Sequence, residues 1–125
     1  MPSADKTASR RLGDAGEEIA LLYLQEQGHE CLSRRFRTRY GEIDLIVRHD
    51  EILSFVEVKT RRGLGFGRPE EAVDNRKLRT MRRVAGAFLA TVRVPGVASY
   101  RFDVVAILFG RDGMSLSHFR GAGVF

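Results

Sequence analysis

The chain has 125 residues, of which 43% are hydrophobic, and this is enough for one domain with a core. Its formal net charge is +5, with basic residues concentrated at 34–39, 59–63 and 75–83. The hydrophobic content argues against global disorder, and the lack of a run of about 18 apolar residues argues against a membrane span. The basic residues favour a polyanionic partner, and the alternative is a basic surface kept for solubility. One cysteine, Cys31, excludes an internal disulfide and favours the reducing cytoplasm.

The N-terminal part predicts a tail, a helix and a short strand. Residues 1–9 are expected to form a flexible tail, because they are polar and hold no apolar segment typical of a secretory signal. Residues 10–125 are expected to form a single domain. Apolar residues at helical spacing predict a helix over about 8–27, ended by Gly28, with a mixed strand over 30–37 after it.

The clearest pattern is a β-hairpin. Two alternating runs, GEIDLIVRH and ILSFVEVK, flank a polar two-residue turn at 50–51. Pairing outward from this turn places Ile46 opposite Phe55 and Asp44 opposite Glu57. The hairpin therefore brings two carboxylates together on one face of a sheet.

The C-terminal half predicts a loop, a helix and two strands. Residues 60–69 hold three glycines and three arginines and are expected to form a mobile basic loop. A helix is predicted from Pro69 to about Thr91, followed by an apolar central strand over 100–109 and an edge strand over 114–119. The order αβββαβ indicates an α/β fold with a mixed sheet, in which the second helix allows a parallel crossover.

Asp44 and Glu57 form the first candidate site. Like charges placed opposite each other destabilise a sheet, and an apolar environment increases the cost. Either a raised pKa on one acid or a bound cation such as Mg²⁺ would relieve it. Lys59 projects from the same face and could act on a water or a phosphate. The alternative is structural: Lys59 pairs with Glu42, while Glu57 is solvated at the sheet edge.

Three further charged residues are ambiguous on sequence alone. Glu17 borders the buried face of the first helix, so it could reach Asp44 or simply interact with the helix dipole. Lys77 lies on an apolar stripe and could point to the same pocket or extend to solvent. Asp103 sits in an apolar strand and is expected to form a structural ion pair, with Arg101 as one partner. The three histidines show no spacing typical of zinc and are expected on the surface or in loops: His29, His49 and His118.

Five motifs together resemble a small bacterial family. GDAGEEIALLYL, RTRYGEIDLI, FVEVKTRR, FGRPEEAV followed by Lys77, and YRFDVV recur in this order in the uncharacterised YraN-like family of predicted endonucleases. The resemblance covers about residues 10–108. That family is placed in the PD-(D/E)XK nuclease superfamily and is similar to Holliday junction resolvases and restriction endonucleases. This chain departs from the pattern at Ile43, where the motif has proline, and at Arg35, where family members often carry Asn.

The resemblance implies a restriction-endonuclease-like αβββαβ core, with a mixed sheet flanked by helices. Asp44 would be the motif aspartate, Glu57 and Lys59 would belong to the (D/E)XK element, and Glu17 would be the glutamate of the first helix. The carboxylates of Asp44 and Glu57 and the carbonyl of Val58 would hold Mg²⁺ or Mn²⁺. Lys59 would act on the attacking water, and the products would carry a 5′-phosphate.

The expected function is therefore that of a Mg²⁺-dependent endonuclease that hydrolyses phosphodiester bonds of DNA, including branched or damaged DNA, in the cytoplasm. A homodimer would fit the symmetric cutting of two strands by resolvases. The residues expected to contact nucleic acid are Arg61, Arg62, Arg68, Arg76, Lys77, Arg79 and Arg83. Two alternatives remain: a non-catalytic nucleic-acid-binding module, and a subunit of a DNA-processing assembly.

Overall fold

The computed structural model describes residues 4–63 and 74–121. In chain order its elements are α1 (Ala4–Glu26), β1 (Glu30–Thr38), β2 (Gly41–His49), β3 (Ile52–Arg62), α2 (Asn75–Thr91), β4 (Ser99–Gly110) and β5 (Gly113–Phe119). The predicted αβββαβ order is confirmed, and the predicted edge strand follows it as β5.

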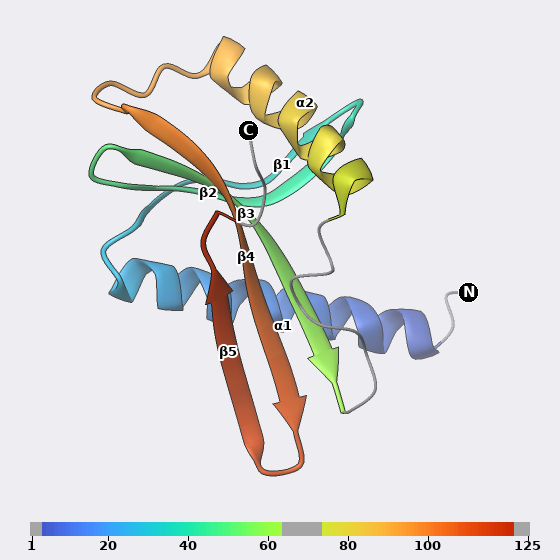
Figure 1. Ribbon diagram of the computed structural model, residues 1–125. Coiled ribbons are helices and arrows are strands. Elements are labelled where there is room, and N and C mark those ends of the chain that lie inside the picture. The colour runs from blue at the N-terminus through green and yellow to red at the C-terminus, as the bar shows by residue number, and fades with distance from the viewer. Residues whose placement is uncertain (1–3, 64–73, 122–125) are drawn as a thin grey trace.

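The five strands form one mixed sheet in the order β1-β2-β3-β4-β5 (Figure 1). β3 and β4 are parallel, joined by the crossover that contains α2, and the other neighbours are antiparallel. The apolar strand β4 lies inside the sheet, and β5 lies at its edge, as predicted. This topology agrees with a restriction-endonuclease-like core.

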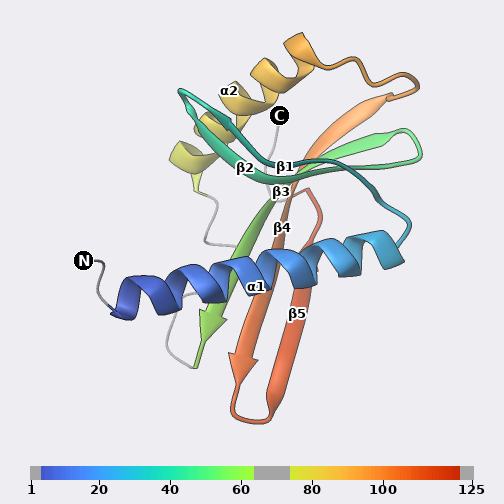
Figure 2. The same cartoon turned by 180° about the vertical axis from the view of Figure 1, so that it is seen from behind.

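The two helices cover different parts of the sheet and form two cores. α1 crosses the sheet diagonally on one side, while α2 lies by the β1–β2 end on the other side (Figure 2). The α2 core contains Met81, Val84 and Phe88 of the helix together with Ile46, Phe55 and Phe102 of the strands. The α1 core contains Ala20, Leu21 and Leu24 together with Leu45, Val56 and Val105. Because successive side chains of β2 and β3 point to opposite faces of the sheet, both strands contribute residues to both cores.

α1 begins earlier than predicted, and α2 is a capped helix from Asn75 onward. α1 begins at Ala4, so residues 4–9, expected to be a tail, are helical. The side chains of Thr7 to Arg11 are exposed, so this first part of the helix has no apolar periodicity to reveal it. α2 begins at Asn75, because the Asp74 side chain accepts a hydrogen bond from the backbone N–H of Lys77 at 2.8 Å and caps the helix.

The first residues of the predicted loop over 60–69 belong to a strand. β3 continues to Arg62 and pairs with β4 along its whole length, ending at the Arg62–Phe109 pair. Strand β4 provides hydrogen-bond partners for the backbone of these basic residues. The glycines and arginines of the sequence do not reveal this pairing. The rest of that segment, with the predicted helix start at Pro69, lies outside the described residues.

Candidate active site

The hairpin register is as predicted up to the point where the site begins. β2 and β3 pair from His49–Ile52 to Leu45–Val56, including Ile46 opposite Phe55. The ladder stops there, and the next residue, Asp44, is bound through its side chain: its Oδ2 accepts a hydrogen bond from the backbone N–H of Val58 at 2.7 Å. The Asp44 carboxylate thus lies beside Glu57 at the place where the two strands stop pairing.

The environment of Asp44 disfavours its charged form. Burial, the largest cause, and the nearby Glu57 and Glu17 carboxylates together raise the pKa of Asp44 to about 7, against the opposing effects of the Val58 amide and Lys77. Residues from both helical layers therefore influence one carboxyl group, since Glu17 belongs to α1 and Lys77 to α2. A raised pKa on one acid is one of the two predicted ways to reduce the repulsion between the facing carboxylates.

Glu57 is buried, and two lysines pair with it. Its side chain is 7% exposed, and its Oε1 lies 3.4 Å from Lys59 Nζ and 3.5 Å from Lys77 Nζ. The structural alternative for Lys59 is wrong, because Glu42 lies instead 3.6 Å from Arg37 and Glu57 is not solvated. Lys77 reaches into this site with its ammonium group, although 34% of its side chain remains exposed.

Glu17 enters the site from the middle of α1. It lies thirteen residues after Ala4, so an interaction with the N-terminal helix dipole does not explain it. The preceding residue, Gly16, allows the approach: a Cβ there would lie 1.9 Å from Thr60 Oγ1 of β3. Glycine therefore brings α1 onto the strand that carries Glu57.

Arg35 completes the α1 side of the site, and sequence reasoning gave it no role. Its guanidinium donates two hydrogen bonds to Glu17 Oε2, at 2.7 and 3.0 Å, and one to Asp14. It lies between the pairs Arg34–Leu45 and Phe36–Ile43, hence opposite Asp44, and its φ of 51° is rare for a residue with a side chain. Counting outward from the tight β1–β2 turn would have placed it there.

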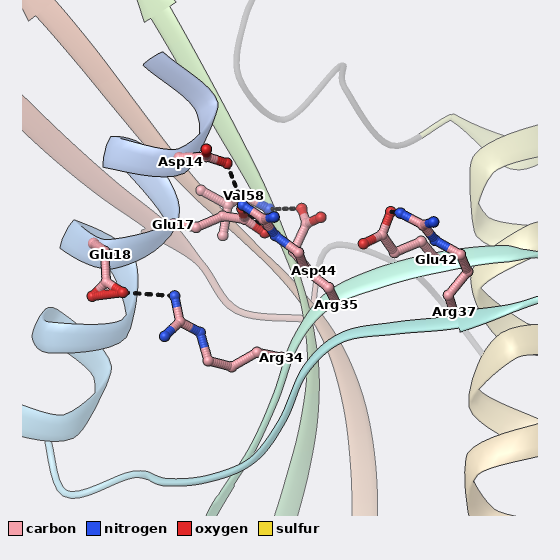
Figure 3. A network of polar contacts seen from close by, with 9 residues as sticks. All are labelled: Asp14, Glu17, Glu18, Arg34, Arg35, Arg37, Glu42, Asp44 and Val58. Carbon is pink, nitrogen blue, oxygen red and sulfur yellow. Dashed lines mark hydrogen bonds and ion pairs between the residues drawn. The ribbon is translucent and has the colours of Figure 1, made fainter. Parts of the chain in front are cut away.

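A pocket of about 290 Å³ opens where these elements meet. Figure 3 shows Arg35 between the α1 acids and Asp44, with the Arg34–Glu18 and Arg37–Glu42 pairs further out. The lining residues are Arg10, Gly13, Asp14, Glu17, Arg35, Arg37, Glu42, Asp44 and Val58. Glu17, Asp44 and Val58 thus share one solvent-accessible pocket.

The donor set fits a hard divalent cation with few protein ligands. Residues 4–63 and 74–121 hold no group of three or more His, Cys, Asp or Glu side chains placed to ligate one ion. Mg²⁺ usually takes only one or two carboxylates and completes its shell with water and phosphate. Asp44 and Glu57 supply two carboxylates that repel each other. Val58, which lies between Glu57 and Lys59 in sequence, supplies a carbonyl. Together these groups meet the requirement.

The basic residues expected to bind nucleic acid fall into separate groups. Arg61 and Arg62 are exposed at the end of β3. The arginines of α2 are exposed on its outer face: Arg76, Arg79 and Arg83. Lys77 lies in the acidic site. Arg68 lies outside the described residues.

Asp103 and the histidines form a second buried network, away from this pocket's lining. Asp103 accepts hydrogen bonds from Arg101 at 2.8 and 3.1 Å, so the expected ion pair is confirmed. The expectation of surface or loop histidines is wrong for His118, which lies in β5 with its side chain 3% exposed and 2.8 Å from Asp103. His49 is exposed as expected, and His29 lies in the connection after α1 as expected but is only 8% exposed, with its ring 5.1 Å from that of His49. Three different elements bring them together, which sequence spacing cannot reveal.

The fold and site define an α/β domain with a buried Glu57 beside a half-buried Asp44, flanking lysines and an arginine-rich surface. The chain belongs to the family described as "Uncharacterised protein family UPF0102", whose model matches residues 16–107. This is the family that the motifs indicated. The matched range includes Glu17, Asp44, Glu57 and Lys59.

Relatives called "UPF0102 protein" match most of the chain. The one from Syntrophotalea carbinolica is 46% identical over 111 residues, which cover 89% of each chain. The one from Nocardia farcinica is 50% identical over 97 residues, covering 78% of this chain and 76% of the relative. The one from Acidothermus cellulolyticus is 45% identical over 128 residues, covering 93% and 97%. Among the described residues, no helix is both long and apolar enough to cross a membrane.

Proposed function

We propose that this protein is a Mg²⁺- or Mn²⁺-dependent endonuclease that hydrolyses phosphodiester bonds of DNA. The observation that carries the proposal is the Asp44–Glu57 pair: burial and mutual repulsion hold the pKa of Asp44 at about 7. A cation between the two carboxylates would remove this cost, and a strongly perturbed acid that lines a pocket, as Asp44 does, is typical of functional sites.

The chain's own residues support hydrolysis as follows. Asp44 and Glu57 would hold the metal ion, together with the Val58 carbonyl. A bound Mg²⁺ supplies positive charge to the scissile phosphate and lowers the pKa of its water. Lys59, 3.4 Å from Glu57, is held in place to donate a hydrogen bond to a phosphate oxygen or to orient the attacking water.

The cations around the acids have separate roles. Lys77 also contacts Glu57, and it would neutralise that acid before the metal and the phosphate arrive. Arg35 holds Glu17, so Glu17 acts by shaping the pocket and by its charge near Asp44. Exposed arginines at the end of β3 and along α2 would bind backbone phosphates, which makes DNA binding depend on salt.

The test is cleavage of labelled linear, flapped and four-way DNA with Mg²⁺ or Mn²⁺. Wild-type protein should cut at least one of these, and Asp44→Asn, Glu57→Gln and Lys59→Met should each lose most of the activity. Glu18→Gln, purified in parallel, is the control, because Glu18 lies on the same helix but is exposed and pairs with Arg34 at 2.7 Å. Equal cutting by Lys59→Met and wild type would refute the catalytic assignment.

A non-catalytic nucleic-acid-binding module is the second candidate. The observation that favours it is that protein cations already compensate two of the acids: Lys59 and Lys77 pair with Glu57, and Arg35 pairs with Glu17. Calorimetric titration with Mn²⁺ separates the two functions. Heat of binding that disappears in Asp44→Asn supports the nuclease, and salt-sensitive DNA binding without any metal binding supports the module.

Location and assembly follow from the proposed activity. A DNA-cutting enzyme with a single cysteine fits the cytoplasm, and a homodimer would supply two sites for two strands. Light scattering of the purified protein measures the assembly directly. A monomer that still resolves four-way DNA symmetrically would contradict the dimer.

A further inference from the structure

A second pocket lies where the β1–β2 turn meets α2. It has a volume of about 370 Å³ and is lined by Arg39, Tyr40, Arg76, Arg79, Thr80 and Arg83. Figures 1 and 2 both show the tip of the β1–β2 hairpin beside the first half of α2. This volume falls in the range of ligand-binding pockets, about 300–1,000 Å³.

Gly41 brings the turn onto the helix. Its φ is +149°, and a Cβ there would lie 2.8 Å from Thr80 Cγ2 and 3.8 Å from Val84 Cγ2. The Thr38 hydroxyl fixes the turn by accepting a hydrogen bond from the Tyr40 N–H at 3.0 Å. The neighbouring side chains of the turn are therefore held against α2 before any ligand arrives.

Four arginines line this pocket, and its lining contains no carboxylate from the described residues. Among the described residues, no carboxylate pairs with Arg39, Arg76, Arg79 or Arg83. Four guanidinium groups around one hollow repel each other, so an anion in the pocket would be favourable. The guanidinium fork matches phosphate oxygens in particular.

Tyr40 adds an aromatic surface to this cationic pocket. The residue is 42% exposed, and its hydroxyl accepts a hydrogen bond from Arg39 Nη2 at 2.8 Å. The guanidinium carbons of Arg39 and Arg83 lie 4.9 and 5.6 Å from the ring centroid. A phosphate alone needs no aromatic ring, whereas exposed aromatic rings beside arginines are typical of sites that stack unpaired bases.

We propose that this pocket binds an unpaired nucleotide of a DNA substrate, with its base against Tyr40 and its phosphates on the surrounding arginines. Bases inside a duplex are stacked on their neighbours and do not offer a free face to a side chain. The pocket therefore selects DNA with a flap, an overhang or a branch point. This substrate class rests on the proposed nuclease function, but the binding itself does not.

Helix α2 contributes residues both to this pocket and to the candidate active site. Lys77, which contacts Glu57, follows Arg76 directly and precedes Thr80 by less than one helical turn. An unpaired nucleotide in the pocket would thus lie beside the phosphate presented to Asp44 and Glu57. Such an arrangement would direct cutting to the boundary between paired and unpaired DNA.

The test measures binding in EDTA, so that no cleavage is needed. Fluorescence anisotropy compares a labelled single strand, a blunt duplex, and the same duplex with a short flap. Wild type should bind the single strand and the flap more tightly than the blunt duplex. Tyr40→Ala should weaken binding to the first two by roughly 5- to 150-fold and change duplex binding by less than about twofold. Tyr40→Phe should retain most of the preference.

Controls separate the pocket from general effects. Tyr100→Ala removes another exposed tyrosine, on β4, and should leave the preference intact. Arg79→Gln should weaken binding to all three DNAs and lower the salt dependence by about one counterion. Circular dichroism should show Tyr40→Ala folded as wild type, and Tyr40→Leu repeats the test if it is not.

Three results overturn the proposal: equal weakening of duplex and unpaired DNA by Tyr40→Ala, unchanged binding to unpaired DNA by this variant, or no DNA binding by the wild type. The nuclease proposal fails separately, since loss of the Tyr40 effect leaves metal-dependent cutting intact. Conversely, a protein that never cuts can still show the Tyr40 preference.

Discussion

Replacing Asp44 by Asn is expected to stabilise the metal-free protein at alkaline pH. Asp44 is ionised there although burial and the nearby Glu57 disfavour its charge. Asn removes the charge, and its side-chain oxygen can still accept the hydrogen bond that the Val58 N–H donates at 2.7 Å. The substitution therefore isolates the electrostatic cost of the site.

The sign and size follow from the pKa of Asp44. The folded protein holds this proton up to about pH 7, whereas the unfolded chain releases it near 3.8. The free energy of unfolding of the wild type therefore falls as the pH rises through this interval, and the full cost above pH 7 is roughly 4 kcal/mol. Because the pocket admits solvent, we expect a measured gain for Asp44→Asn of about 2–4 kcal/mol at pH 8.5 and near zero at pH 4.

Urea unfolding followed by circular dichroism, in EDTA at pH 4, 6 and 8.5, measures this difference. Glu18→Gln serves as the control, because its exposed carboxylate should show no such pH-dependent gain. If Asp44→Asn is less stable than the wild type at pH 8.5, or if its effect is the same at every pH, Asp44 is not a buried and repelled acid.

Three further predictions concern the scaffold and the metal. Gly16→Ala should destabilise the protein by about 1–3 kcal/mol in thermal melts because its Cβ would collide with Thr60, whereas Gly13→Ala, with open space around it, should stabilise by up to about 1 kcal/mol. Burial alone would raise the pKa of Asp103, but hydrogen bonds from His118, Arg101 and the Gly121 N–H hold it below its ordinary value. Asp103→Asn should therefore cost roughly 3–5 kcal/mol at pH 7, and urea titrations should show the cost shrinking below pH 4. Mn²⁺ should raise the melting temperature of the wild type at pH 8 and leave that of Asp44→Asn unchanged.

The hairpin could be predicted because local signals agree there. Alternation fixes the face of each side chain, and the polar turn fixes the register, so Ile46 opposite Phe55 follows from counting. The same counting placed Asp44 beside Glu57. It could not show that the ladder stops one residue earlier and that Asp44 binds the Val58 amide.

Contacts between distant segments were beyond sequence reasoning. Lys59 pairs with Glu57 and not with Glu42. This pairing depends on the twist of the sheet and on the position of Lys77, which contacts Glu57 from α2. Counting from the β1–β2 turn places Arg35 opposite Asp44, but it does not predict the left-handed backbone conformation of Arg35 or its ion pair with Glu17. Ion pairs between elements arise from tertiary packing, so a pattern of charges along the chain leaves several partners open.

The central claim is that Asp44 and Glu57 converge on one metal ion. A crystal soaked in Mn²⁺ tests this most directly, because the ion's anomalous signal locates it without assumption. We predict a single strong peak within coordination distance of both carboxylates and the Val58 carbonyl. A structure with no peak there, and with Lys59 and Lys77 still paired to Glu57, would contradict the claim.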